Sequence, residues 1–511
     1  MTIAAAPDVP VNRAMVTISV MLATIMTALD ITIANVALPH MAGSVSASAD
    51  QITWVLTSYI VASAIMTPMS GWLAARLGRK QVFVLSIIGF TLASALCGAA
   101  QTLGEIVAFR VLQGMFGAAM GPLSQAIMLD TFPAEQRGPA MAIWGIGVMV
   151  APIVGPVLGG WLTDDFSWRW VFYINLPIGV LCLVGVMGFI HDTDQPSKVP
   201  FDILGFSLLS LMLGSLQLFL DRGQSNDWFN SVEIQIEFTT AILALFLFVV
   251  HTLATDRPFL PRALFTDSNF VTASVMSLVV GMLVFSVLAL LPPMAETLLG
   301  YPVVTTGMVM APRGFGGLIS MVVVGQMVSR IDARVLIAAG FAFFCASFFL
   351  MSHFSLQMNA TAIAVTGFIQ GLGTGLVFMP MTILAFATLA PGLRADAAGA
   401  FALVRNLGQS VGVSIMQALF IRNSDVVHAR LAEAVRPDNP MMRAPWMRAP
   451  FGLNTPLGLA ALDGEVSRQA AMVAYIDVFR IMFVATAIMI PMVMLLKRPD
   501  MGVPLQVDIS E

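Results

Sequence analysis

The sequence predicts an all-α integral membrane protein with about fourteen transmembrane helices. The chain of 511 residues is 58% hydrophobic and only 11% charged, whereas a soluble domain is about a quarter charged. Its apolar stretches are long and continuous, without the alternation that a membrane β-strand shows. Because backbone groups in lipid must form their hydrogen bonds within the protein, these stretches are expected to be helices.

The apolar stretches can be placed one by one, since a helix needs about 20 apolar residues to cross the hydrocarbon. Six spans are expected in the first part of the chain, at 14–36, 52–72, 81–99, 103–128, 138–161 and 170–190. Eight more are expected at 203–221, 233–253, 270–292, 305–328, 334–352, 360–386, 396–421 and 477–496. The first stretch is too long for a signal-peptide core, so we predict that it is a membrane span of the mature protein.

Basic residues indicate the orientation of these spans. They gather in the connections on one side, which hold Arg13, Arg76, Arg79, Lys80, Arg137, Lys198, Arg257, Arg262, Arg330, Arg334, Arg394, Lys497 and Arg498. The short connections opposite hold only Arg169 and Arg222. By the positive-inside rule, both termini (1–13 and 497–511) are predicted to be cytoplasmic. The Arg-rich loop 422–476 is predicted to be periplasmic, because long loops translocate largely regardless of charge.

An internal repeat divides the chain into two halves. The stretch from Gly71 to Arg76 after the second span resembles the stretch from Gly325 to Arg330 after the tenth, and Gln113-Gly114 of the fourth span resembles Gln370-Gly371 of the twelfth. The offset is about 255 residues in both cases, and parallel six-helix repeats are typical of major facilitator transporters. We therefore predict six-helix bundles at 14–190 and 270–496, joined by linkers and two inserted helices at 191–269.

Motifs along the chain resemble those of the major facilitator superfamily, and in particular the 14-span drug:proton antiporters of the EmrB type. The resemblance rests on Leu29–Pro39 (LDITIANVALP), Gly71–Lys80 (GWLAARLGRK), Arg110–Gly114 (RVLQG), the stretch from Gly147 to Gly160, Trp168–Gly179, the stretch from Gly214 to Trp228, and the stretch from His428 to Pro440. It implies a major facilitator fold and proton-coupled export of hydrophobic or amphipathic compounds across a bacterial inner membrane. It also implies a periplasmic adaptor (EmrA-like) and an outer-membrane channel (TolC-like) as partners, with loop 422–476 as a candidate adaptor contact.

Within the resemblance, the cytoplasmic loop motif contributes Gly71, Arg76, Gly78 and Arg79 as residues expected to control conformational change. The family usually has an acidic residue at the fifth position of this motif, and here that residue is Ala75. Arg76 and Arg79 are therefore expected to find other partners or to act through helix ends. A simpler interpretation is that these charges only set the topology.

Charged residues inside the predicted spans are hypotheses about function, because a charge in hydrocarbon costs several kcal/mol. Asp30 and Arg110 are expected about 9–10 Å below the same membrane surface, at 1.5 Å per residue. We predict that they form the proton-coupling pair, although a static ion pair that fixes helix registry is the alternative. For Arg313 and Arg405, packing contacts and substrate contacts remain equally open.

Polar residues in the spans are candidates to line a substrate cavity: Asn35, Gln113, Gln125, Arg313, Gln370, Arg405 and Asn406. The fifth span carries Gly147, Pro152, Gly155, Pro156 and Gly159. Proline loosens the helix and spaced glycines allow close helix approach, so this span is predicted to provide a rocking surface between the halves that also seals against proton leak. Ordinary packing is the alternative.

Other functional classes have little support in the sequence. The net charge of −4 does not favour a nucleic-acid partner, and the three cysteines and five histidines form no metal-binding or cofactor motif. The sequence contains no nucleophile motif, Walker motif or paired catalytic carboxylates, so neither an enzyme nor a flippase is favoured. A receptor is disfavoured because no large cytoplasmic domain is predicted. The remaining alternative is a facilitator or symporter for a small solute.

Overall fold

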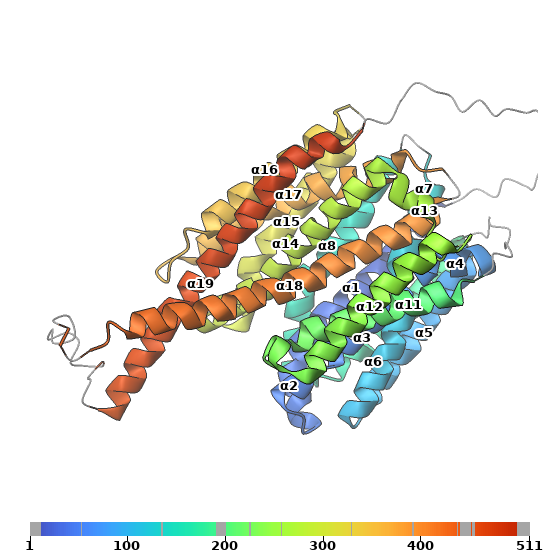
Figure 1. Cartoon of the computed structure of the whole chain (residues 1–511). Coiled ribbons are helices and arrows are strands. Elements are labelled where there is room, and N and C mark those ends of the chain that lie inside the picture. The colour runs from blue at the N-terminus through green and yellow to red at the C-terminus, as the bar shows by residue number, and fades with distance from the viewer. Residues whose placement is uncertain are drawn as a thin grey trace, which may run out of the picture.

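The computed structural model describes residues 12–52, 54–133, 136–190, 201–223, 226–256, 258–328, 330–390, 393–436, 438–439, 451 and 455–497, and the regular structure within these ranges is helical (Figure 1). The first half comprises α1 (Arg13–Ser44), α2 (Ala49–Ile52), α3 (Trp54–Met66), α4 (Met69–Leu77), α5 (Arg79–Ala99), α6 (Leu103–Gly117), α7 (Met120–Thr131), α8 (Arg137–Asp165), α9 (Trp170–Tyr173) and α10 (Asn175–Phe189). Between the halves lie α11 (Ile203–Arg222), the turn η2 (Trp228–Asn230), α12 (Val232–Ala254) and α13 (Arg262–Thr266). The second half comprises α14 (Ser268–Pro293), the π-turn η3 (Met294–Leu298), α15 (Val303–Met327), α16 (Ala333–Met351), α17 (Ala360–Ala387), α18 (Arg394–Ala432), α19 (Pro456–Met492) and η7 (Val493–Leu495).

Helices occupy every range in which the sequence predicts a span, but the count of fourteen membrane crossings is not confirmed. Among the described residues, 11 helices are long and apolar enough to cross a membrane, or up to 12 with the pair α3 and α4, which is bent by 55°. The helices α8 and α18 are not among them. Part of α8 has side chains outside the described set, and α18 carries charged and polar side chains such as Asp396 and Arg405.

The predicted periplasmic loop 422–476 is mostly helical over its described residues. The helix α18 continues to Ala432 and α19 begins at Pro456, while residues 440–450 and 452–454 lie outside the described ranges. These two helices pack on each other, and Figure 1 shows them extending past the rest of the bundle. His428 Nε2 and Asp463 Oδ1 lie 3.1 Å apart and connect the extensions.

Local sequence explains where several helices begin and end. Thr102 and Glu105 form a capping box at the start of α6, which satisfies free backbone N–H groups. Asp202 caps α11 by accepting a hydrogen bond from the backbone of Gly205. Gly78, between α4 and α5, has a φ of 91°, a conformation that favours glycine because it has no Cβ.

The helices pack in two groups that meet mainly through α8 and α15. In the first group α1 packs on α8 and α10, and α6 packs on α3 and α5; in the second, α17 packs on α15 and α16, and α18 packs on α14 and α19. The inserted helices α11 and α12 pack on each other, and α11 also contacts α3 and α18. At the predicted cytoplasmic end, α4 and α7 contact α18.

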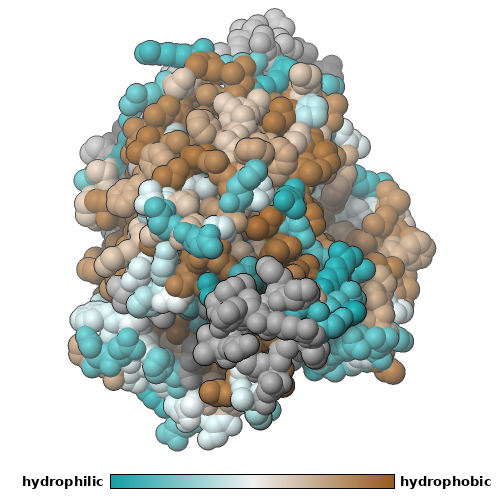
Figure 2. Space-filling model, turned by 90° about the vertical axis from the view of Figure 1, so that its left-hand side faces the viewer, coloured by the Kyte–Doolittle hydropathy of each residue, from teal (hydrophilic) through white to brown (hydrophobic). Residues whose placement is uncertain are grey.

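The outer surface is apolar over large areas, as expected of a chain in lipid. Figure 2 shows broad hydrophobic regions on one face of the molecule. Large apolar side chains point outward from several helices, for example Leu92 of α5, which is 61% exposed, and Val184 of α10, which is 64% exposed. Such a surface is far more apolar than that of a soluble monomer, so the chain is a multi-pass membrane protein.

Candidate functional site

The centre of the first half holds a buried network of polar side chains from several helices. Asp30 of α1 is 1% exposed and Arg110 of α6 is 0% exposed. Arg110 Nη1 donates to Asp30 Oδ2 at 2.5 Å, as the depth argument from the sequence predicts. Charges this deeply buried persist only when they are paired and hydrogen-bonded, so the surroundings of the pair decide what it can do.

Two amide side chains complete the environment of the carboxylate. Gln113 Nε2 and Asn175 Nδ2 donate to Asp30 Oδ1 at 2.8 and 2.9 Å. Both amides also donate to Ser94 Oγ, at 3.1 and 3.0 Å, and Ser94 in turn donates to the carbonyl of Phe172 at 2.9 Å. Three donors therefore converge on Asp30, which is the arrangement that an ionised carboxylate requires.

Arg110 is held on its other sides by backbone and aromatic groups. Its Nε donates to the carbonyl of Val55 at 2.9 Å, and its guanidinium carbon lies 4.3 Å from the ring centroid of Tyr59. Its Nη2 is buried and has no hydrogen-bond partner among the described residues. The guanidinium is thus positioned by α1, α3 and α6 together, with one donor group left unsatisfied.

Asn175 and Ser94 are members of the network that the sequence did not single out. Asn175 lies within the motif from Trp168 to Gly179, so its polar side chain in an apolar helix was an available signal. Ser94 carried no such signal, because serine is common in membrane helices.

The other predicted cavity residues are not gathered into this network. Gln370 is buried at 0% exposure, and Arg313 donates through Nη2 to the carbonyl of Val284 at 2.9 Å. Arg405 lies over the ring of Phe378, with 5.1 Å between the guanidinium carbon and the ring centroid. Of the remaining candidates, Gln125 on α7 and Asn406 on α18 are half-buried, and Asn35 on α1 is exposed.

The conformational motifs have specific neighbours. Arg79 forms an ion pair with Asp130 of α7, and the guanidinium carbon of Arg76 lies 5.2 Å from the ring centroid of Trp72. Both arginines thus have partners in place of the missing carboxylate at Ala75. Gly71 is buried in α4, beside the contact that α4 makes with α18.

Three glycines of the fifth span face α1, while α8 as a whole also makes the main contact with α15 of the second half, and the rocking surface between the halves stays a prediction. A Cβ on Gly155 would overlap Thr32 Oγ1, and one on Gly159 would lie 3.2 Å from the carbonyl oxygen of Ile33. A Cβ on Gly147 would lie 3.2 Å from the side chain of Met21, also on α1. These glycines let α8 approach the helix that carries Asp30. Pro152 and Pro156 lie within α8, with side chains outside the described set.

Contacts between the halves include a ring stack near the predicted cytoplasmic end. Trp144 of α8 stacks on Phe378 of α17 with 6.5 Å between ring centroids, and its indole N–H donates to Thr24 of α1 at 3.2 Å. Because Arg405 lies over the same Phe378 ring, this cluster connects α1 and α8 of the first half with α17 and α18 of the second.

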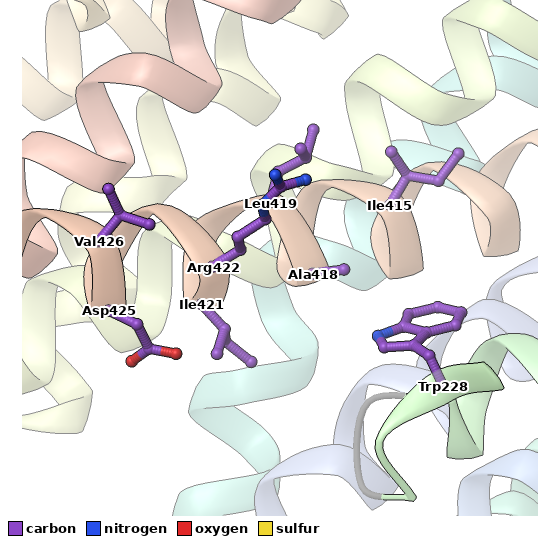
Figure 3. Close-up of a pocket in the computed structure, with 8 residues that line it drawn as sticks. All are labelled: Trp228, Ile415, Ala418, Leu419, Ile421, Arg422, Asp425 and Val426. Atoms are coloured by element: carbon purple, nitrogen blue, oxygen red, sulfur yellow. The ribbon is translucent and has the colours of Figure 1, made fainter. Parts of the chain in front are cut away.

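A cavity of about 540 Å³ lies toward the opposite end, between α18 and Trp228 of the η2 turn (Figure 3). Figure 3 shows Ala418 and Ile421 on the side of α18 that faces the indole. Asp227 and Trp228 both have positive φ, 57° and 50°, which is unusual for residues other than glycine. This turn orients the Trp228 ring against α18. It lies in the stretch from Gly214 to Trp228, which is one of the motifs on which the family resemblance rests.

Comparisons with known proteins agree with this architecture. The family model of the Major Facilitator Superfamily matches residues 20–413. The multidrug export protein EmrB of Escherichia coli (strain K12) is 34% identical over 91% of both chains. The fatty acid resistance protein FarB of Neisseria gonorrhoeae is 34% identical over 95% of this chain and 96% of its own.

The fold is also similar to that of a solved structure. The human organic anion transporter MFSD10 (TETRAN) matches with a TM-score of 0.59 at 13% identity, covering 93% of this chain and 99% of its own. At so low an identity this likeness shows the fold alone. The family match and the two curated relatives go further: the chain belongs to the major facilitator superfamily and, within it, to the group that contains the EmrB multidrug export proteins.

Proposed function

We propose that this chain is a proton-driven exporter of hydrophobic or amphipathic compounds, with Asp30 as the proton-binding group and Arg110 as its partner. The observation that carries the proposal is the buried network in which Arg110, Gln113 and Asn175 all donate to Asp30. The name of the EmrB relative, a multidrug export protein, supports the substrate class.

Proton binding at Asp30 would be coupled to movement by simple hydrogen-bond chemistry. The ionised carboxylate accepts from all three donors, whereas a protonated carboxyl carries a donor of its own. That donor would face the N–H groups of its present partners, so at least one of these neighbours must move away or turn its amide, as Asn175 with its unpartnered Oδ1 would. Since these neighbours lie on α6 and α10 and the carboxylate lies on α1, protonation would shift helices relative to one another.

The contacts between the halves suggest which way the site opens. The helices α4 and α7 of the first half contact α18 of the second half at the predicted cytoplasmic end. We take this as the outward-facing form of an alternating-access cycle. The cavity candidates Asn35, Gln125, Arg313, Gln370, Arg405 and Asn406 would meet the substrate during that cycle.

The setting of the exporter is part of the proposal. We place it in the bacterial inner membrane with both termini in the cytoplasm, on the distribution of basic residues. The extensions of α18 and α19 would then project into the periplasm and offer a helical contact surface for an EmrA-like adaptor. Such an adaptor would connect the exporter to a TolC-like channel in the outer membrane.

Transport in inside-out vesicles tests the proposed function. Vesicles holding the wild-type protein are energised, and an internal-pH dye is followed while cationic dyes, which carry no protons through lipid, are added. We expect substrate-triggered proton release from the wild type and none from Asp30→Asn. The matched control is Asp477→Asn, because Asp477 is partly exposed on α19 and, among the described residues, its ion pair lies within its own helix, with Arg480.

A facilitator or a symporter for a small solute is the alternative function. In that case labelled substrate would cross the membrane without moving protons outward, and Asp30→Asn would transport like the wild type. Either observation, made on a variant that is well expressed, would remove the antiporter proposal.

A further inference from the structure

The second half contains a partly buried arginine, Arg313 of α15, for which no acidic partner lies among the described residues. Arg313 Nη2 donates to the carbonyl of Val284, but its Nη1 is buried and has no hydrogen-bond partner among the described residues. A cation in the membrane interior is costly unless it is paired or solvated. Arg110 in the first half meets this requirement with Asp30, whereas Arg313 does not.

A buried glutamine of the neighbouring helix α17, Gln370, also lacks a partner among the described residues. Gln370 is 0% exposed, and neither its Nε2 nor its Oε1 has a hydrogen-bond partner within the described ranges. Leaving such groups unsatisfied in a protein interior costs roughly 1–3 kcal/mol each. An apolar side chain would serve better at this position if its only role were packing.

The two residues lie where α15 and α17 are in backbone contact. A Cβ on Gly371 would overlap the carbonyl oxygen of Arg313, and a Cβ on Gly367 would lie 3.5 Å from the Cβ of Arg313. Gln370 thus lies between two glycines that both border Arg313. The absence of side chains at these glycines gives the arginine its place at this crossing.

The internal repeat shows that this location corresponds to the proton site of the first half. At the repeat offset of about 255 residues, Gln370 corresponds to Gln113, Ser347 to Ser94 and Gly367 to Arg110. The position of Asp30 corresponds to Phe285 and Ser286, so the carboxylate is missing. Arg313 of the neighbouring helix α15 lies beside Gly367. It supplies a cation at a location where the second half has no counterpart of the Asp30 carboxylate.

We propose that Arg313 and Gln370 form a subsite for the carboxylate of an anionic amphiphile. The Nη1 of Arg313 and the amide of Gln370 provide two donor groups, which match the two oxygens of one carboxylate. A single positive charge fits a monoanion; a dianion would need a second cation. This inference rests on the proposed export function, and it assigns the anion to the second half and the proton to the first.

Binding to purified protein tests the subsite without requiring transport. The probes are a dansyl-labelled undecanoate, its methyl ester and its trimethylammonium analogue, and their dansyl fluorescence gives the Kd. We expect the wild type to bind the carboxylate most tightly. In Arg313→Gln, carboxylate binding should weaken about tenfold to a hundredfold, the range of a charge-assisted hydrogen bond, while ester binding changes less than about twofold.

A second variant keeps the test informative if Arg313→Gln does not fold. In Gln370→Glu the new carboxylate would pair with Arg313 inside the protein, so thermal stability should be kept while the preference for the carboxylate probe is lost. The matched control is Arg430→Gln, on the exposed extension of α18, which removes a positive charge without touching the subsite.

The outcomes separate this inference from the proposed function. Equal carboxylate binding by wild type and Arg313→Gln overturns the subsite, and so does a wild type that binds ester and carboxylate equally. If the carboxylate preference is present and is lost in both variants, but no substrate moves protons in vesicles, the subsite is supported and the export function fails.

Discussion

Replacing Arg110 by methionine should destabilise the folded protein, because it leaves the carboxylate of Asp30 buried without its counter-charge. Arg110 is 0% exposed and Asp30 is 1% exposed, so water cannot take over the lost interaction. Removing one partner of a buried ion pair costs about 3–5 kcal/mol. With the entropy of unfolding typical of a chain of this length, that corresponds to a thermal midpoint lower by about 3–5 °C.

The buried cysteines provide the assay for this prediction. Cys97 and Cys182 are both 0% exposed, so a dye that fluoresces on reaction with thiols reports unfolding in detergent. The double variant Asp30→Asn with Arg110→Met removes both charges and should recover most of the lost midpoint. It should still fail to couple transport to protons, because the carboxyl that carries the proton is gone.

Two results would refute the reasoning. The first is an Arg110→Met protein that unfolds at the temperature of the wild type, since the ion pair would then contribute nothing to stability. The second is a double variant as unstable as Arg110→Met, because the instability would then come from lost packing around the guanidinium and not from an unpaired charge.

Two further predictions concern other contacts. In Gly155→Val the new side chain overlaps Thr32, and overpacking costs about 1–3 kcal/mol, so the thermal midpoint and the export activity should both fall. The control is Gly160→Val, which should resemble the wild type because nothing lies within 4 Å of a Cβ at that position. Equal effects of the two substitutions would contradict this packing. Burial opposes ionisation of Asp202, but hydrogen bonds from backbone N–H groups and from His251 outweigh it and hold the pKa of Asp202 below its usual 3.8. A carboxyl whose pKa is lowered in the folded state stabilises the protein above its ordinary pKa, and this stability is lost as the pH falls through the lowered pKa. The difference in thermal midpoint between wild type and Asp202→Asn should therefore be largest near about pH 6 and become smaller toward about pH 3. A difference that does not change with pH would contradict the prediction.

The positions of the helices could be predicted because apolar stretches long enough to span a membrane have few other structures available. The equal depth of Asp30 and Arg110 followed from their positions along two helices, and the family resemblance, in whose fold both helices border the central cavity, implied that they meet. Neither argument requires the orientation of a helix about its own axis, which a single sequence does not fix. That is why the facing of Gly155 and Gly159 toward α1 was not predicted.

The neighbours of Asp30 and the helical extensions of α18 and α19 were harder to predict for a related reason. Asn175 and Ser94 join Asp30 only because α5 and α10 turn these side chains inward, and nothing in their local sequence fixes that rotation. The extensions of α18 and α19 beyond the predicted spans are polar enough to read as a loop, and they are helical because they pack on each other. Long-range packing therefore decided both features.

Proton release on substrate binding tests the central claim, that Asp30 carries the coupling proton, most directly. Substrate is added to purified protein in weakly buffered detergent and the pH of the solution is recorded. The account predicts acidification with wild type and with Asp477→Asn, and none with folded Asp30→Asn that still binds substrate. Acidification by Asp30→Asn equal to that of the wild type would contradict it and place the coupling proton on another group.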